Sequence, residues 1–138
     1  MILKVKNISN IGGDVKAPPS KSYSHRAVIL ASLAKGTSKL YDMLYSEDTL
    51  ASIRVCEALG AQINEKDDYL EVVGTNGKLH NSSDEPIDLA NSGTTLRLMT
   101  SISALSDNEV ILTGDESLQT RPMGLLMVAL KPLGIETE

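Results

Sequence analysis

Aromatic side chains are scarce in this chain of 138 residues, which has no Phe, no Trp and only 4 Tyr. The core must therefore be aliphatic, and the stacking surface on which many nucleic-acid-binding proteins hold bases is missing. Cations are also outnumbered, with 13 Lys and Arg against 18 Asp and Glu and a net charge of −5. This balance disfavours a broad phosphate-tracking surface, although it allows a small cationic pocket. We expect no nucleic-acid partner.

Cysteine and long apolar runs are scarce too. Cys56 is the only cysteine, so it cannot form an internal disulfide, and no Cys and His have the spacing of zinc ligands. The apolar positions around it favour a buried, inert thiol over a nucleophile. The longest apolar run, 125–130, has six residues, and residues 1–6 lack a signal-peptide core. We expect a cytoplasmic protein with no membrane contact and no zinc site.

The remaining composition is typical of a folded domain, and the pattern of helices and strands predicts the α/β class. A strand is expected up to Val15. The following helix would bury apolar positions at helical spacing and end at Gly36: Ala27, Leu30, Ala31 and Ala34. Further along, we expect strands at 38–41, 87–89 and 109–113, a hairpin at 61–65 and 69–73, and helices at 46–59, 93–105 and 121–133.

The order of elements begins again after a polar loop at 74–85. Four short matches relate the residues before this loop to those after it, at offsets that increase from 70 to 74 residues: 19–22 with 89–92, Arg26 with Arg97, Gly36 with Asn108, and 59–60 with 133–134. We interpret this pattern as a degenerate internal repeat, with a first unit at 15–74 and a second, truncated unit at 86–138.

A polar cluster, residues 20–26, opens the first helix. Helix N-termini carry free N–H groups and a positive partial charge, and Ser22 and Arg26 lie one turn apart with Lys21 just outside the first turn. A guanidinium grips a phosphate or carboxylate with two bonds, while lysine adds a mobile charge. The cluster describes an anion clamp, and the alternative is a serine cap beside two solvated cations. His25 would need a partner to act as a general base, and Asp48 is expected to cap the second helix.

Two further polar clusters, 91–97 and 114–123, also occupy strand-to-helix turns. Gly93 lets a ligand approach the backbone, and Asn91 or Ser92 can cap the helix. The alternatives are a simple tight turn at Gly93, an acidic partner for Arg97 and a surface position for Arg121. All three clusters follow strand ends on the side where α/β folds bind ligands.

These clusters resemble, in order, the N-terminal signatures of the 3-phosphoshikimate 1-carboxyvinyltransferase (EPSP synthase) family. The matching stretches are Pro19-Ser20-Lys21-Ser22-x-Ser24-His25-Arg26, Asn91-Ser92-Gly93-Thr94-Thr95-x-Arg97 and Gly114-Asp115-x-Ser117-Leu118-x-x-Arg121-Pro122-Met123. The resemblance covers essentially the whole chain. It implies the enolpyruvyl transferase fold, an inside-out α/β barrel of repeated βαβαββ units. It also implies transfer of the enolpyruvyl group of phosphoenolpyruvate to the 5-hydroxyl of shikimate 3-phosphate, in the shikimate pathway of aromatic amino acid biosynthesis.

By the same resemblance, Lys21, Ser22 and Arg26 would hold shikimate 3-phosphate, and Lys21, Gly93 and Arg121 would hold phosphoenolpyruvate. Lys21 would lie between the two anions and act as the catalytic residue. No metal or organic cofactor is implied. Two anionic substrates repel each other, so preorganised cations are needed to bring them together and to stabilise charge in the transition state.

Members of that family are longer, with two domains that each hold three copies of the unit around a cleft. The resemblance therefore implies that residues 1–138 are an incomplete N-terminal domain with half of the active site, inactive without the C-terminal domain. It also implies that the strand at 1–14 crosses to that domain. Two alternatives stay open. One is a non-catalytic anion-binding or interaction module of the same fold, and the other is a UDP-N-acetylglucosamine enolpyruvyltransferase, whose reactive cysteine would fall near Glu116 here.

Overall fold

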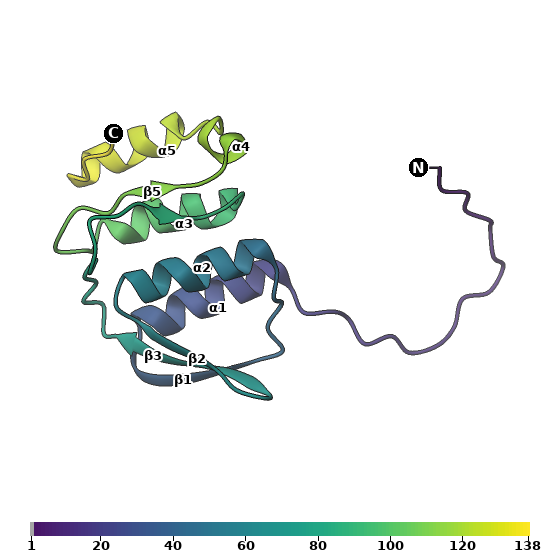
Figure 1. The fold of residues 1–138 in the computed structure, drawn as a ribbon. Coiled ribbons are helices and arrows are strands. Elements are labelled where there is room, and N and C mark those ends of the chain that lie inside the picture. Colours follow the sequence, from purple (N-terminus) through teal and green to yellow (C-terminus); the bar gives the residue numbers. More distant parts are fainter. Residues whose placement is uncertain (1) are drawn as a thin grey trace.

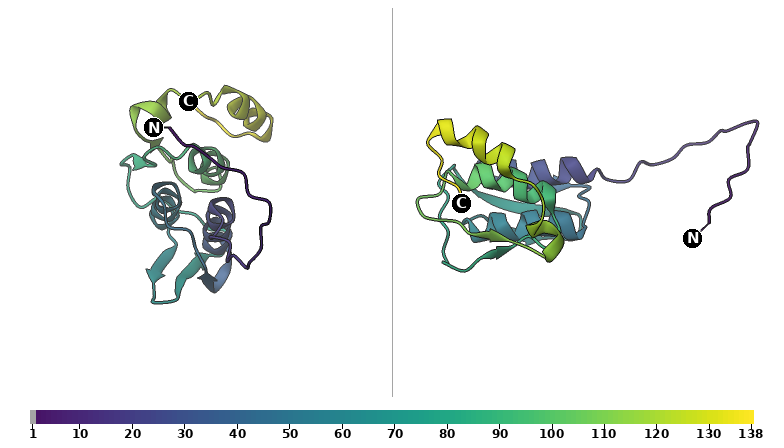
Figure 2. Two further views of the ribbon diagram at one scale, coloured as in Figure 1. Left: turned by 90° about the vertical axis from the view of Figure 1, so that its right-hand side faces the viewer. Right: turned by 90° about the horizontal axis from the view of Figure 1, so that it is seen from above.

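Three helices lie side by side in the middle of the molecule, and the strands lie outside them (Figure 1 and Figure 2). The computed structural model describes residues 2–138. The three helices are α1 (Lys21–Leu33), α2 (Glu47–Ala58) and α3 (Gly93–Ser103). Two short helices, α4 (Glu116–Gln119) and α5 (Gly124–Leu130), and a 3-10 turn, η1 (Lys131–Leu133), follow. Within residues 2–138 no helix is both long and apolar enough to cross a membrane.

The strands form two small sheets. β1 (Lys35–Tyr41) and β2 (Gln62–Glu65) both pair antiparallel with β3 (Tyr69–Thr75), which lies between them. β4 (Ile87–Asp88) pairs parallel with β5 (Leu112–Thr113). α1 packs on β3, and α2 contacts β2 and β4. The structure thus confirms the α/β class and the expected hairpin. It places α1, α2 and α3 inside the strands, whereas α4 and α5 lie at the edge of the molecule beyond β5 (Figure 1).

The strand expected up to Val15 is wrong, because residues 2–20 contain no helix and no strand (Figure 1). This segment runs away from the folded part, and its large apolar side chains are exposed: Ile2, Leu3, Val5, Ile8, Ile11 and Val15. A strand needs a neighbour to accept its hydrogen bonds, and none of the described strands pairs with this segment. That the segment crosses to a second domain stays a prediction.

The buried face of α1 also differs from the expected one. Leu30 is 66% exposed, whereas the buried positions of the helix are Ser24, His25, Val28, Ile29, Ala31 and Ser32. These positions form one broad face of the helix, on the side opposite Leu30, because α1 packs against both α2 and β3. The helix ends at Leu33, and Gly36, with φ of +87°, lies within β1 rather than at the helix end.

In the second half of the chain, the last predicted helix is interrupted. The helix predicted at 121–133 begins only at Gly124, because Arg121 N–H closes a turn on the carbonyl of Leu118 at the end of α4. Gly134 adopts the left-handed conformation after η1, where the predicted helix was expected to end. The N-caps of α1 and α3 are Ser20 and Ser92, 72 positions apart (92 − 20), so the alignment of 19–22 with 89–92 is displaced by two residues.

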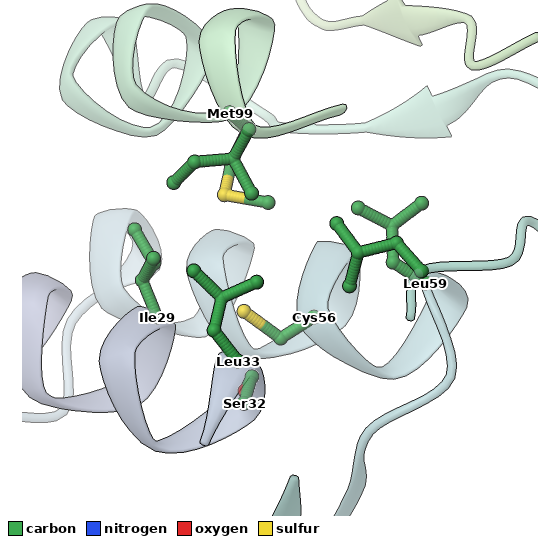
Figure 3. Close-up of a pocket in the computed structure, with 8 residues that line it drawn as sticks. Ile29, Ser32, Leu33, Cys56, Leu59 and Met99 are labelled. Atoms are coloured by element: carbon green, nitrogen blue, oxygen red, sulfur yellow. The ribbon is translucent and has the colours of Figure 1, made fainter. Parts of the chain in front are cut away.

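The core lies between the three helices and the larger sheet. Its most deeply buried apolar side chains include Val28, Val55, Leu59 and Met99. Figure 3 shows a small pocket in this core, which is lined mainly by apolar side chains, Leu59 and Met99 among them, and by Ser32 and Cys56. Cys56 is 3% exposed, and burial raises the pKa of its thiol to about 11. The expectation of a buried thiol is confirmed, and its lack of reactivity stays a prediction.

Candidate functional site

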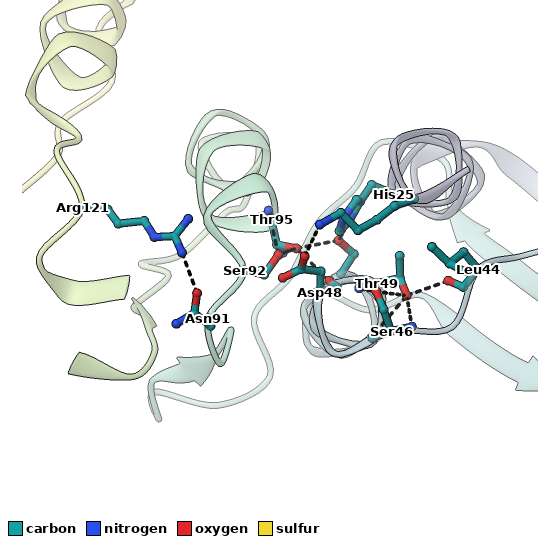
Figure 4. Close-up of polar contacts among 11 residues, drawn as sticks. His25, Leu44, Ser46, Asp48, Thr49, Asn91, Ser92, Thr95 and Arg121 are labelled. Carbon is teal, nitrogen blue, oxygen red and sulfur yellow. Dashed lines mark hydrogen bonds and ion pairs between the residues drawn. The ribbon is translucent and has the colours of Figure 1, made fainter. Parts of the chain in front are cut away.

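The N-termini of α1, α2 and α3 meet at one end of the helix layer, and each helix begins with a capping serine. Ser20, Ser46 and Ser92 accept hydrogen bonds from backbone N–H groups three residues further on, at 3.4, 3.4 and 3.2 Å. Contacts between first turns hold the three ends together: Lys21 reaches Asp48, and Thr95 Oγ1 donates to the Asp48 carbonyl at 3.1 Å (Figure 4). Free N–H groups and helix dipoles make such an end attractive to anions.

Lys21 is the first residue of α1, rather than lying just outside the helix as expected. Its Nζ donates a hydrogen bond to Asp48 Oδ2 at 2.5 Å. The Asp48 side chain is 27% exposed, and the hydrogen bond from Lys21 lowers the pKa of this carboxyl group, although burial acts in the opposite direction. The expectation that Asp48 caps α2 is wrong, because Ser46 is the cap and Asp48, in the first turn, orients the lysine.

Ser22 and Arg26 occupy exposed positions on the first two turns of α1. Neither side chain makes a hydrogen bond or ion pair within residues 2–138. The serine of this cluster that caps the helix is Ser20, so the Ser22 hydroxyl and the Arg26 guanidinium are free to bind a ligand.

Gly93, the first residue of α3, lies against Arg121. A Cβ atom on Gly93 would overlap Arg121 Nη1 and would lie 3.1 Å from Arg97 Nη1. Arg121 Nη2 donates to Asn91 Oδ1 at 2.5 Å (Figure 4), and Asn91 Nδ2 donates to Asp115 Oδ2 at 2.8 Å. Glycine is therefore required for this close approach, and a chain of polar side chains holds the guanidinium beside the α3 backbone.

The turn into α3 is unusual at Ala90, which has a left-handed φ of +50° that is rare for alanine. Its N–H donates to Asp88 Oδ1 at 2.8 Å, and its carbonyl accepts from the Asp115 N–H at 2.9 Å.

Arg97 does not have the acidic partner considered from the sequence. It donates to the carbonyls of Gly93 and Pro122, at 3.2 and 3.4 Å. Side chains and backbone carbonyls thus position both guanidinium groups.

Behind the surface groups, four side chains form a buried polar network. His25 Nδ1 lies 2.8 Å from Ser52 Oγ, and Thr95 Oγ1 lies 2.9 Å from Ser52 Oγ and 2.7 Å from Ser92 Oγ. His25 is 1% exposed, and burial lowers the pKa of its imidazole, with Asp48 opposing this effect. By the interpretation of the sequence, His25 needs a partner to act as a general base. The partner in the structure is the buried Ser52, and this contact does not make His25 a general base for a bound ligand.

The arrangement suits small anions. Lys21 and Arg26 lie on α1, and Arg97 and Arg121 lie around the start of α3, so cations gather at two neighbouring helix N-termini in a chain of net charge −5. These groups can bind and orient phosphate or carboxylate and stabilise negative charge that develops there. Among residues 2–138, no three His, Cys, Asp or Glu side chains gather in a way that would hold a metal ion.

The structure brings the predicted site residues together only in part. Gly93 and Arg121 are in contact, and Lys21 is joined to the start of α3 through Asp48 and Thr95. Two residues were missed as site residues: Asp48 was interpreted as a cap alone, and Asn91 was considered only as a cap. Each meets its partner across 27 or more positions of sequence, so no local pattern signals the contact.

Residues 5–138 match the family model of EPSP synthase (3-phosphoshikimate 1-carboxyvinyltransferase). The chain is 77% identical over 135 residues to the 3-phosphoshikimate 1-carboxyvinyltransferase of Methanobrevibacter smithii, covering 98% of this chain and 31% of that relative. It is 54% identical over 136 residues to that of Methanothermobacter thermautotrophicus, covering 99% of this chain and 32% of the relative. It thus spans about a third of the length of these curated relatives.

Among solved structures, the chain is similar to EPSP synthase from Acinetobacter baumannii, with a TM-score of 0.82 and 28% identity. The superposition covers 90% of this chain and 28% of that one. This likeness confirms the predicted enolpyruvyl transferase-like fold, of which the chain covers a part. With a family match over nearly all of its residues and close relatives of one kind, the chain belongs to the EPSP synthase family.

Proposed function

We propose that this chain forms part of the active site of a protein that transfers the enolpyruvyl group of phosphoenolpyruvate to the 5-hydroxyl of shikimate 3-phosphate. The observation that carries the proposal is the pair of cationic sites at adjacent helix N-termini. Lys21 is oriented by Asp48 at the start of α1, and Arg121 is held against Gly93 at the start of α3. Two anionic substrates that must react need two such sites side by side.

In this proposal the residues divide between the two substrates. Lys21, Ser22 and Arg26 bind shikimate 3-phosphate, because the serine hydroxyl and the guanidinium are exposed and unengaged on α1. Gly93 and Arg121 bind phosphoenolpyruvate, since Gly93 has no side chain to obstruct a ligand and Arg121 is fixed beside it. Lys21 contacts both substrates and is the catalytic residue. The preorganised cations stabilise charge as the new C–O bond forms and, later, as phosphate leaves.

Other parts of the site lie outside this chain, which spans about a third of its curated relatives. The partner of the proposed half-site is the rest of the same protein. We therefore expect the 138 residues alone to bind shikimate 3-phosphate weakly, without turning it over.

Titration calorimetry of shikimate 3-phosphate into the 138-residue chain tests the proposal. We expect binding that weakens as salt is raised, because screening reduces attraction between exposed charges. Arg26→Ala should weaken it by roughly tenfold or more, the loss of a charged hydrogen bond. Lys78→Ala is the matched control, since it removes the same charge from an exposed loop beside the C-terminal end of α1.

Identical affinities for wild type and Arg26→Ala, or no phosphate-dependent binding at low salt, would contradict the proposal. Such a result would favour the alternative of an interaction module without substrate chemistry. The other alternative, transfer to UDP-N-acetylglucosamine, would need an accessible thiol near Glu116. The only cysteine is Cys56, which lies in the core and whose pKa is raised to about 11.

A further inference from the structure

Buried hydrogen bonds cross from α1 through α2 to α3 directly behind the ion pair of Lys21 and Asp48 (Figure 4). His25 lies four residues after Lys21, and Ser52 lies four residues after Asp48, so each pair shares one face of its helix. The two helices are therefore joined twice. The ion pair joins them at the surface, and the bond of 2.8 Å between His25 Nδ1 and Ser52 Oγ joins them one turn further in.

The protons in this network can be placed by counting, because a hydroxyl donates one hydrogen bond and accepts up to two. Thr95 Oγ1 must donate to the carbonyl of Asp48, since a carbonyl oxygen only accepts. Its contact with Ser52 must then be a donation from the Ser52 hydroxyl to Thr95 Oγ1. The hydroxyl proton of Ser52 is then used in the hydrogen bond to Thr95. Ser52 Oγ therefore accepts a hydrogen bond from His25, and Nδ1 carries the proton of the ring.

The second ring nitrogen of His25 supports the same assignment. Nε2 is buried and has no hydrogen-bond partner within residues 2–138. A proton on Nε2 would create a buried N–H group without an acceptor, whereas a bare lone pair leaves only an acceptor unfilled. A proton on both nitrogens would add a charge to a side chain that is 1% exposed. The ring is therefore neutral and held in one tautomer.

We infer that His25 is a positioning residue. As the neutral Nδ1–H tautomer, it fixes through Ser52 and Thr95 how the N-terminus of α1 lies against those of α2 and α3. The inference rests on the proposed function in one respect, since Lys21 and Gly93, whose spacing is set in this way, are proposed substrate-binding groups. Ser52 belongs to the first predicted repeat unit and Thr95 to the second, so the same bonds join the two units at the site.

The tautomer can be measured without any ligand. In the 138-residue chain labelled with ¹⁵N-histidine, the chemical shifts of the two ring nitrogens show which of them carries the proton. We expect Nδ1 of His25 to be protonated and Nε2 to be bare at neutral pH. The signals of the exposed His80 are separated from those of His25 by comparison with the His25→Asn variant. A protonated Nε2, or an imidazolium, would overturn the inference.

Four variants test the positioning role. Asparagine at position 25 presents an amide N–H near the place of Nδ1, so His25→Asn should retain the bond to Ser52. Glutamine presents its amide near the place of Nε2, so His25→Gln should lose that bond. Ser52→Ala removes the acceptor. Ser32→Ala is the matched control, because Ser32 is also buried on α1 but takes no part in the network of His25, Ser52 and Thr95.

The readouts are the affinity for shikimate 3-phosphate and the backbone amide shifts of Lys21 and Gly93. We expect Ser52→Ala and His25→Gln to weaken binding roughly fivefold, the effect of one neutral hydrogen bond, with amide shifts displaced at both positions. His25→Asn and Ser32→Ala should stay close to wild type in both measurements. Equal loss in His25→Asn and His25→Gln, or wild-type behaviour of Ser52→Ala, would overturn the inference.

Failure of the proposed function is distinguishable from failure of this inference. If the wild-type chain does not bind shikimate 3-phosphate, the proposed function fails, and the tautomer and the amide shifts still decide the role of His25. Thermal unfolding of each variant identifies any that does not fold, and the tautomer of the wild-type chain needs no variant except for assignment.

Discussion

Replacing Gly93 by alanine should displace Arg121 without unfolding the protein. The new Cβ atom would overlap Arg121 Nη1 and lie 3.2 Å from Arg121 Cζ and 3.1 Å from Arg97 Nη1. All three atoms are at the ends of flexible side chains, so the backbone can stay in place. The Arg121 guanidinium has to move by about 1 Å to reach ordinary van der Waals contact. That movement breaks its 2.5 Å hydrogen bond to Asn91.

The expected cost therefore falls on binding rather than on folding. Alanine is up to about 1 kcal/mol more favourable than glycine in a helix, which offsets the lost contact of an arginine side chain that is not fully buried. We expect the free energy of unfolding to change by less than about 1 kcal/mol. If Arg121 binds phosphoenolpyruvate, misplacing one charged hydrogen-bond donor should raise the Kd for that ligand roughly 10- to 100-fold.

The assay is a titration of phosphoenolpyruvate into ¹⁵N-labelled chain, following the Nε–H signal of Arg121, together with urea unfolding. Gly124→Ala is the matched control, because Gly124 is also the first residue of a helix and a Cβ there would have no neighbour within 4 Å. The reasoning is refuted if Gly93→Ala binds phosphoenolpyruvate as wild type does with the Arg121 signal unmoved. Equal losses in Gly93→Ala and Gly124→Ala would refute it as well.

Three further outcomes are expected. Burial lowers the pKa of His25 below 6.5, an effect that the charge of Lys21 reinforces and that of Asp48 opposes. The unfolded chain then binds a proton that the folded chain does not, so the free energy of unfolding should fall as pH drops below about 6.5. Urea unfolding at pH 7 and pH 5 checks this, and an equal fall in His25→Asn would contradict it. Gly74→Ala should destabilise the fold by about 1 to 3 kcal/mol or more, because its Cβ would overlap backbone carbonyl oxygens at the end of α1 that cannot move aside. Chemical denaturation measures this, and a wild-type midpoint would count against the packing of β3 on α1. Cys56, whose pKa is raised to about 11, should react with a thiol reagent only as fast as the chain unfolds. Native-state labelling at the rate of a free thiol would show that the core is open.

The sequence by itself determined the parts of this protein that depend on local physics. Caps, dipoles and helical spacing place Lys21, Ser22 and Arg26 at the start of one helix and Gly93 at the start of another, and the structure has both helices there. The hairpin of β2 and β3 follows from a polar turn between two short strands. The three ordered motifs were enough to indicate the EPSP synthase family, which the family match confirmed.

Only the tertiary structure decided which of these residues meet. Asp48 orients Lys21 and Ser52 is hydrogen-bonded to His25, each from 27 positions away, while Asn91 holds Arg121 from 30 positions away. Such contacts depend on how helices pack, which no repeating pattern along one helix reports. The same reason explains Leu30, which has the spacing of a core residue but faces solvent because the buried face of α1 lies on the opposite side of the helix. It also explains the opening segment, whose alternating apolar residues make no strand because a strand exists only where another pairs with it.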